Sequence, residues 1–377
     1  MPLTVALAGD TMFGRGVAAR LAEVGPRSLV AQEVRDVAAE ADLFVLNLEC
    51  CISERGEPWE APGKPFFFRA PPVAVETLTW LGVHAVTLAN NHALDFGPDA
   101  LHDTLGYLAG AGIAAVGAGA DEAQAREPAV LQARCVRLGV LGATDHPADF
   151  AAGPQRSGVA YADLHAGVPA WLFDGVRRLR AAADLVLVTP HWGPNMTPGP
   201  VGHVRAAVRA LRAAGVDLVA GHSAHVPHGT ADGICYDLGD FVDDYRVHPQ
   251  LRNDLGLLFL VTLDGGGASA VSAVPLALDY CHTRLAVGGE YIWMRNRFAA
   301  ACAALGTEMT TAADGALPSA GIDLWKEDRD GEGADMTTRG LDVAALRRGR
   351  CCRWGILPTW SRCWTGPVRF GPARAAG

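Results

Sequence analysis

The stretch Leu88-Ala89-Asn90-Asn91-His92-Ala93-Leu94-Asp95-Phe96-Gly97 places amide, imidazole and carboxylate side chains directly after a short apolar run. Residues 84–88 are typical of a buried strand, and Pro98 with Asp99 opens a predicted helix that runs towards Gly110. The polar cluster therefore lies on a strand-to-helix loop, where α/β proteins gather ligands and catalytic groups. An Asn-Asn pair also forms turns and a single His is often structural, so this stretch alone leaves both interpretations open.

The same arrangement recurs at four other places along the chain. Apolar runs cover residues 3–8, 43–48, 184–189 and 216–220, and polar side chains follow at Asp10, at Asn47 with Glu49, at His191, and at His222 with His225. Carboxylates, amides and imidazoles are ligands that suit Mn²⁺, Fe²⁺, Zn²⁺ or Mg²⁺. The pattern therefore predicts a divalent-metal site, with one or two ions, at the ends of the strands.

Segments with helical spacing of apolar residues separate these strands. They cover residues 28–41, 98–109, 169–182 and 201–214, and the alternation predicts a largely parallel sheet with helices on its faces. After Gly233 the rhythm changes, because strands at 234–238, 255–263 and 268–276 follow with short connections. The Asp264-Gly265-Gly266-Gly267 turn indicates a hairpin, so antiparallel strands should extend or face the first sheet. A last helix is expected over 291–305.

Composition limits the class of protein. The 377 residues are 50% hydrophobic and carry a net charge of −9, which argues against a protein that coats nucleic acid. Asp10 and Arg15 interrupt the apolar start of the chain, so we expect neither a signal peptide nor a transmembrane segment there, and a cytoplasmic location. The nine cysteines show no Cys-x-x-Cys spacing, which indicates a reducing compartment.

Seven motifs together resemble those of the CapA family, the capsule and poly-gamma-glutamate synthesis proteins. They are Gly9-Asp10-Thr11-Met12-Phe13-Gly14-Arg15, Asn47-Leu48-Glu49, Phe68-Arg69-Ala70-Pro71-Pro72, Ala89 to Gly97, His191-Trp192-Gly193, Gly221-His222-Ser223-Ala224-His225 and Leu238-Gly239-Asp240-Phe241. Their order and spacing match to about Leu276, and weaker similarity extends to about Trp325. The family resembles the calcineurin-like metallophosphoesterases, which implies an α/β fold of four layers, an αββα sandwich of two facing sheets flanked by helices.

The resemblance also implies a domain organisation. A metallophosphoesterase-like domain is expected over residues 1–290, and a helical extension of the same domain over 291–325. Residues 326–377 are rich in charge, Gly, Arg, Cys and Trp without helical or strand periodicity, so we expect a poorly ordered or loosely packed tail.

Carried over residue by residue, the resemblance assigns metal ligands. Asp10 matches the Asp of the superfamily's first Asp-x-His, but Met12 stands where the His would be, so a single metal is at least as plausible as two. Glu49 falls near the bridging carboxylate, with Asn47 placed to ligate metal or to orient it. His191 matches the isolated His ligand. The last motif has one extra residue between His222 and His225, which implies that only one of these two ligates in the superfamily's manner.

The Asn91-His92 pair resembles the superfamily pair in which the Asn ligates metal and the His protonates the leaving group. Asp95 lies three residues after His92. Its carboxylate would either fix the tautomer of the imidazole as a catalytic partner or cap the following helix, and both interpretations stay open.

Basic side chains suggest how an anionic substrate would bind. Lys64 and Arg69 flank an aromatic run, and Arg15 follows Asp10 by about one turn; structural salt bridges are the alternative. Asp240 departs from the Asn that the family more often has, and it would hold metal or a substrate amine, or cap a turn. Trp192 should wall the pocket, and loop residues of secondary interest are His228, Asp145 and His146. No role is assigned to His84, His165 or His203.

Two functions follow as hypotheses. The first is a metal-dependent hydrolase that uses metal-activated water on a phosphoester or an amide such as a gamma-glutamyl bond. Its substrate would be a small molecule, a peptide or an anionic polymer. The second is a non-catalytic accessory protein that binds an anionic capsule-type polymer during synthesis or export. An enzyme that tailors a small peptide or amide metabolite is a variant of the first.

Overall fold

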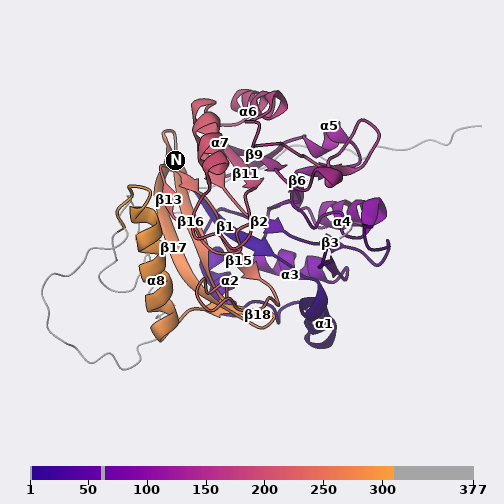
Figure 1. Cartoon of the computed structure of the whole chain (residues 1–377), viewed down its shortest axis with the longest axis horizontal. Helices are drawn as coiled ribbons and strands as arrows, with labels where there is room; N and C mark the ends of the chain where they lie inside the picture. Colours follow the sequence, from indigo (N-terminus) through magenta and orange to yellow (C-terminus); the bar gives the residue numbers. More distant parts are fainter. Residues whose placement is uncertain (1, 61–63, 310–377) are drawn as a thin grey trace, which may run out of the picture. The chain divides into compact units, whose positions relative to one another are not determined.

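The computed structural model describes residues 2–60 and 64–309. In this part of the chain two β-sheets face each other, and helices cover their outer faces, which gives the four layers of an αββα sandwich (Figure 1). The fold is therefore the α/β architecture that the resemblance implied.

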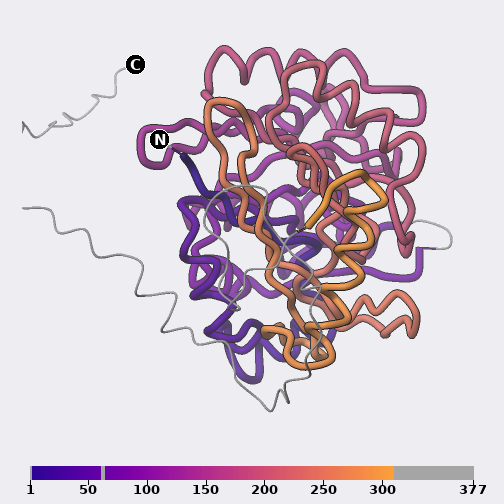
Figure 2. The backbone as a smooth tube through the Cα atoms, turned by 90° about the vertical axis from the view of Figure 1, so that its left-hand side faces the viewer, coloured from indigo at the N-terminus to yellow at the C-terminus, as the bar shows by residue number. Residues whose placement is uncertain are grey.

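The first sheet has eight strands. In spatial order they are β18 (His282–Leu285), β17 (Gly267–Asp279), β16 (Leu255–Asp264), β1 (Leu3–Thr11), β2 (Leu43–Leu48), β5 (Ala85–Thr87) and β6 (Ala114–Val116), and β15 (Asp240–Val242) pairs with the end of β1. Strands β1, β2, β5 and β6 run parallel. Strands β16, β17 and β18 form an antiparallel meander that pairs with β1 through β16. Figure 2 shows this orange meander beside the indigo N-terminal strand.

The second sheet has six strands. Their spatial order is β13 (Thr230–Ala231), β14 (Ile234–Cys235), β12 (Leu218–Ala220), β11 (Leu185–His191), β9 (Val136–Thr144) and β8 (Ala129–Ala133). The four middle strands are parallel, and the two edge pairs are antiparallel. The alternating sequence pattern alone suggested a single, largely parallel sheet; that interpretation is wrong, because the parallel strands divide between the two sheets.

Side chains alternate along β1 between two separate cores. Leu3, Val5 and Leu7 point between the sheets, whereas Ala6 and Ala8 point to the outer layer. Helices α1 (Arg15–Val24), α2 (Gln32–Ala38), α3 (Ala74–Leu81) and α4 (Gly97–Gly110) cover that outer layer. Helices α6 (Ala170–Ala182) and α7 (Gly202–Ala213) cover the other sheet.

Helix α8 (Gly288–Ala303) lies along the antiparallel meander (Figure 1). Its Met294 and Phe298 enter the core between the sheets, where Phe298 packs edge-on against Phe259 at 5.6 Å between ring centroids. The predicted helix over 291–305 is therefore part of the packed structure. Residues 310–325 of the predicted extension, and all of the predicted tail over 326–377, lie outside the described residues.

Shorter elements complete the fold. They are the paired strands β3 (Cys51–Ile52) and β4 (Arg69–Ala70), the paired strands β7 (Ala118–Gly119) and β10 (Gly158–Val159), helix α5 (Glu122–Ala125) and the 3₁₀ helix η1 (Ala148–Phe150). The six cysteines in the described part of the chain are free. Within the same residues, no helix combines the length and the apolar character that a membrane crossing requires.

Two predicted elements are shorter than expected, each for a local reason. The helix predicted over 28–41 is only α2, because the backbone just before it is extended and the N–H of Ala31 donates to the carbonyl of Thr283 at 2.8 Å. The strand predicted over 234–238 ends at Cys235, because the Asp237 carboxylate accepts the backbone N–H groups of Ala224 and Gly239 and turns the chain.

Candidate metal centre

Strands from both sheets end at one place. Asp10 is the penultimate residue of β1 and Glu49 directly follows β2, whereas His191 ends β11 and His222 follows β12. A single bridge pairs His191 with His222, and all four residues are at most 1% exposed. The site is therefore assembled across the two sheets, as the positions of the polar residues after their strands predicted.

Close backbone contacts shape this edge of the first sheet. A Cβ atom on Gly9 would lie 1.7 Å from the carbonyl oxygen of Gly239, so only glycine fits where β1 meets the segment that leads into β15. The register then places Asp10 beside Asp240 on one side and Asn47 on the other.

The loop after β12 holds a strained backbone. Ser223 and His225 have φ angles of 109° and 59°, which cost free energy for residues other than glycine. Asp237 holds the loop in place by accepting the N–H of Ala224 at 2.8 Å. As a result both His222 and His225 reach Asp10, in spite of the extra residue between them: His222 Nδ1 is 3.4 Å from Asp10 Oδ1, and His225 Nδ1 is 3.3 Å from Asp10 Oδ2.

Two overlapping groups of side chains are suited to cations. Asp10, Glu49 and His191 each offer one ligand atom within 4.8 Å of the others, and so do Asp10, His225 and Asp240. Asp10 belongs to both groups. His191 Nε2 lies 3.5 Å from Glu49 Oε1, and His225 Nδ1 lies 2.8 Å from Asp240 Oδ1.

Several ligand atoms of these groups and of the neighbouring His222 are buried without a hydrogen-bond partner in residues 2–60 and 64–309. They are both carboxylate oxygens of Glu49, both ring nitrogens of His191, Nδ1 of His222 and Oδ2 of Asp240. Buried polar atoms are otherwise almost always paired, because an unpaired one costs about 1–3 kcal/mol. The donor set therefore fits a divalent cation, which would satisfy these atoms and neutralise the carboxylates.

The burial of these side chains and the charges of their neighbours also shift their pKa values. Burial, followed by the nearby charge of Asp10, raises the pKa of Glu49 well above its usual range, and burial with the neighbouring carboxylates does the same to the pKa of Asp240. Burial opposes the charge of Asp10, but the neighbouring imidazoles of His222, His225 and His191 lower its pKa overall. Burial lowers the pKa of His191, which favours the neutral imidazole that binds metal.

An amide chain orients Asp10. Asn47 Nδ2 donates to Asp10 Oδ1 at 2.7 Å, and Asn90 Nδ2 donates to Asn47 Oδ1 at 2.9 Å. Asn47 thus takes the orienting position of the two that the sequence left open. The first Asn of the Asn-Asn pair is structural, whereas the amide oxygen of Asn91 is buried without a hydrogen-bond partner among the described residues.

His92 and Asp95 form a pair at the edge of this cluster. His92 Nδ1 lies 2.6 Å from Asp95 Oδ2, which also accepts the N–H of Phe68 at 2.6 Å, while Lys64 Nζ lies 3.0 Å from Asp95 Oδ1. Helix α4 has Phe96 at its N-cap position and no side-chain cap, so Asp95 holds His92 instead of capping the helix. Burial lowers the pKa of His92, although Asp95 opposes this effect.

The predicted basic residues make other contacts. Arg15 forms a salt bridge with Asp244, and Arg69 donates to the carbonyls of Arg55 and Gly56 at 3.2 and 3.1 Å. Lys64 contacts Asp95 and the carbonyl oxygen of Asn91. Of the three, Lys64 is thus the one that the structure joins to the His92 pair, and substrate binding by Arg15 and Arg69 stays a prediction.

Sequence reasoning missed three neighbours of the cluster. Asp237 and Asp243 are buried acids on the chain segment around β15, and Tyr245 packs against His225 at 5.3 Å between ring centroids. Burial raises the pKa of Asp243 to about 6. The signal in the sequence was the spacing of Asp237, Asp240 and Asp243, which puts an acid at every third position of one short segment.

Other residues singled out in the sequence have structural contacts. Met12 is fully buried, and its sulfur accepts the N–H of Gly14 at 2.9 Å. Trp192 is buried beside the site and donates to the carbonyl of Tyr236 at 3.0 Å. His228 bonds to the carbonyl of Thr197 at 2.9 Å, and burial lowers its pKa to about 4. His84 Nδ1 accepts the N–H of Phe44 at 3.1 Å.

The two facing sheets and the buried carboxylates and imidazoles at their strand ends define an αββα protein with a candidate divalent-metal centre. The profile of a family described as bacterial capsule synthesis protein PGA_cap matches residues 4–245. The chain belongs to this family, which confirms the resemblance read from the motifs.

Relatives carry names from the same process. A probable polyglutamine synthesis accessory protein of Mycobacterium tuberculosis is 32% identical, with 84% of this chain and 95% of that protein covered. The PGA biosynthesis protein CapA of Bacillus subtilis is 30% identical over 64% of this chain and 63% of its own length. A solved hypothetical protein from Thermus thermophilus aligns at 17% identity with a TM-score of 0.42, covering 74% of this chain and 100% of its own, and nothing about function follows from that.

Proposed function

We propose that the protein is a metal-dependent hydrolase that cleaves a phosphoester or a gamma-glutamyl-type amide bond. The observation that carries the proposal is the group of buried, unpartnered ligand atoms on Glu49, His191 and Asp240 around Asp10, within the described residues. A cluster that served only to stabilise the fold would pair these atoms with one another or with the backbone.

The ligand set supports one or two cations. Asp10 belongs to both candidate groups, so it is the residue that two ions would share. His225 and Asp240 supply the second group with the donors that Met12 cannot supply. When bound, such a cation acidifies water near neutral pH and polarises the scissile group.

His92 is placed to move a proton at the rim of the cluster. Its ring is buried but for 7% of the residue surface, and Asp95 holds Nδ1, which leaves Nε2 as the nitrogen to face a substrate. A lowered pKa makes the protonated ring a stronger acid, and Asp95 stabilises that protonated form when it arises. His92 would therefore protonate the leaving group, with Asp95 and Lys64 as positioning residues.

The names of the relatives support a polymer-related substrate and also the second candidate function. One relative is described as a probable polyglutamine synthesis accessory protein and another as a PGA biosynthesis protein, so both names refer to the synthesis of a polymer. A non-catalytic protein that binds such a polymer would keep the fold and the metal without turnover. The two functions differ in whether His92 matters.

The test is hydrolysis by the purified full chain after metal removal and after stepwise return of Mn²⁺, Zn²⁺ or Mg²⁺. Bis(p-nitrophenyl) phosphate and gamma-glutamyl-p-nitroanilide probe the two bond classes. We expect hydrolysis of one of them that a chelator abolishes, that metal restores, and that Glu49→Gln and His92→Ala both reduce. Arg55→Ala, on an exposed ion pair, is the matched control and should keep full activity.

Failure has a defined form. If metal binds but neither probe nor poly-gamma-glutamate is cleaved, the hydrolase proposal is wrong. Binding of poly-gamma-glutamate that survives Asp10→Ala and His191→Ala would then support the accessory function.

A further inference from the structure

A cavity opens beside the candidate metal centre. It has a volume of about 480 Å³ and is lined by Asp145, His146, His165, Gly193, Pro194, Asn195, Val201 and His203. Three of these eight residues are histidines, and the hydrolytic function proposed above uses none of them. The sequence assigned no role to His165 and His203, which lie within or beside predicted helices and strands. In the structure His165 lies on a loop and His203 in the first turn of α7.

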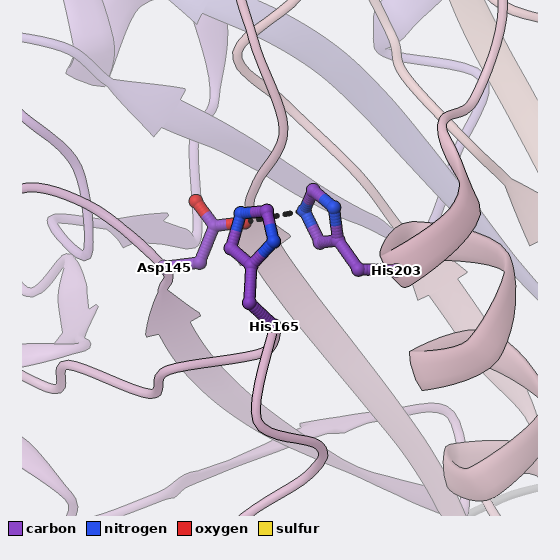
Figure 3. Close-up of side chains that lie close together, drawn as sticks. All are labelled: Asp145, His165 and His203. Carbon is purple, nitrogen blue, oxygen red and sulfur yellow. Dashed lines mark hydrogen bonds and ion pairs between the residues drawn. The ribbon is translucent and has the colours of Figure 1, made fainter.

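Two of these imidazoles converge on one carboxylate (Figure 3). His203 Nε2 lies 3.0 Å from Asp145 Oδ2, and the ring centroids of His165 and His203 lie 3.8 Å apart, with the two rings tilted by 33°. Asp145, His165 and His203 each offer a ligand atom within 4.8 Å of the other two. Three donors at this spacing, two of them imidazoles, form a set that Zn²⁺ and similar ions accept.

The local backbone holds these donors in place. The Asp163 carboxylate accepts the N–H groups of His165 and Ala166 at 3.1 and 3.3 Å, which fixes the loop that carries His165. Asp145 follows β9, is 8% exposed, and accepts the N–H of Gly193 at 2.9 Å. The imidazole of His146 contacts its other oxygen. The carboxylate is therefore buried and oriented, while His165 is exposed and free to adjust to an ion.

We propose that Asp145, His165 and His203 form a second site for a divalent transition-metal ion such as Zn²⁺, with an open coordination position that faces the cavity. Three protein ligands with an open fourth position are the pattern of zinc sites that also bind an external ligand. The cavity leaves room for that ligand, and a carboxylate or phosphate group would suit it.

The second site lies next to the first. His146 lines the cavity, and its ring centroid is 5.0 Å from that of His191 in the metal centre. Ser223, which follows His222, donates to the carbonyl of Gly193 at 2.9 Å. One extended anionic substrate could thus contact both sites, but metal binding in the cavity does not depend on the hydrolase proposal.

Metal counting on the full chain tests the proposal. After dialysis against Zn²⁺, we expect the His165→Ala, His203→Ala double variant to hold about one equivalent less than the natural sequence. The Glu49→Gln variant should lose the ion held by Asp10, Glu49 and His191 and keep the ion in the cavity. In the Co²⁺-loaded Glu49→Gln protein, visible absorption should remain, and the two further His substitutions should lower it by the share of one ion.

Two controls keep the outcome interpretable. His102→Ala removes an exposed histidine on α4 and should change neither the metal content nor the spectrum. Circular dichroism and thermal unfolding should show that the double variant is folded, and the single His165→Ala variant repeats the test at an exposed residue.

Equal metal content and unchanged Co²⁺ spectra in the double variant would overturn the proposal. It would also fail if the double variant lost only affinity for inorganic phosphate, since the cavity would then be an anion pocket that uses the histidines and the N-terminus of α7. If Glu49→Gln loses hydrolysis but keeps the cavity metal, the cavity site binds metal independently of the strand-end centre. The cavity proposal and the hydrolase proposal can then fail separately.

Discussion

The strand-end cluster and the nearby arginines differ in whether their polar atoms have hydrogen-bond partners within the described part of the chain. In the cluster, the oxygens of Glu49 and the ring nitrogens of His191 have no hydrogen-bond partner in the described part of the chain. Nearby, Arg15 is held by Asp244, and Arg69 by two backbone carbonyls. The difference motivates the proposal of a metal at the cluster, because the described part of the chain supplies partners for the arginines and leaves these cluster atoms without hydrogen-bond partners.

This difference predicts that substitutions in the two regions change the stability of the metal-free protein in opposite directions. Removing a charge from the cluster should relieve repulsion in the metal-free protein and abolish binding. Removing a charge from an arginine contact should cost stability and leave metal binding intact.

Glu49→Gln should have the largest effect. Metal affinity and any hydrolysis should fall by more than about 100-fold, because even the loss of an outer partner of a ligand costs about 10–100-fold. The metal-free variant should unfold at the same or a higher temperature than the metal-free natural protein, because burial already favours the neutral form of Glu49. Isothermal titration and calorimetric unfolding measure the two quantities.

A lower melting temperature of the metal-free Glu49→Gln protein would contradict the comparison, since Glu49 would then be stabilising the fold by a contact of its own.

Asp95→Asn should come next. The amide keeps the shape and an acceptor for the N–H of Phe68 but no longer stabilises a protonated His92. We expect turnover to fall by about 100-fold, within the range for general acid catalysis. Metal content should stay unchanged, because Asp95 belongs to neither candidate metal group. An equal loss of metal would show that the pair supports the cluster instead of the proton transfer.

Arg15→Ala should act on stability alone. It leaves the Asp244 side chain, 5% exposed, with the N–H of Gly16 as a donor at 2.9 Å. The expected cost is about 1–2 kcal/mol of unfolding free energy, at the lower part of the range because Arg15 is partly solvated. Arg15→Lys keeps the charge but not the fork and should lose less. Reduced substrate affinity at unchanged stability would instead support the substrate-binding role predicted from the sequence.

Arg55→Ala should have the smallest effect on stability, because the Arg55–Asp103 pair is exposed. Hydrogen bonds from Arg55 and Ser53 lower the pKa of Asp103 from its usual 3.8 to about 2. A lowered pKa in the folded state contributes stability above pH 3.8 that is lost as the pH falls towards 2. Urea unfolding between these limits should therefore show a shallower pH dependence in Arg55→Ala.

The fold was predictable where one strand or helix stands on its own pattern. The hairpin of β16 and β17 follows from the Asp264 to Gly267 turn between two apolar runs, and α7 from its spacing. Periodicity alone failed to divide the parallel strands between two sheets, because strands buried on both faces give the same apolar runs in either arrangement. The family resemblance supplied that division.

The positions of Asp10 and His191 at the ends of buried strands were predictable from the sequence, whereas their role as metal ligands stays a prediction. Site prediction failed where contacts depend on side chains reaching across long sequence gaps. His165 and His203 meet only because a fixed loop and the first turn of α7 approach Asp145. Neither residue follows a strand, so no strand-end rule could find them.

The apolar side chains packed between the two sheets set the distance between the two halves of the candidate metal centre. Asp10 and Glu49 come from one sheet and His191 and His222 from the other, so the thickness of the layer that contains Leu7 and Leu187 sets the gap between the two halves. Trimming either leucine would let the halves settle closer and misplace the donors without altering any of them. The packing of the core between the sheets therefore sets how precisely the donor atoms of the candidate metal centre are positioned.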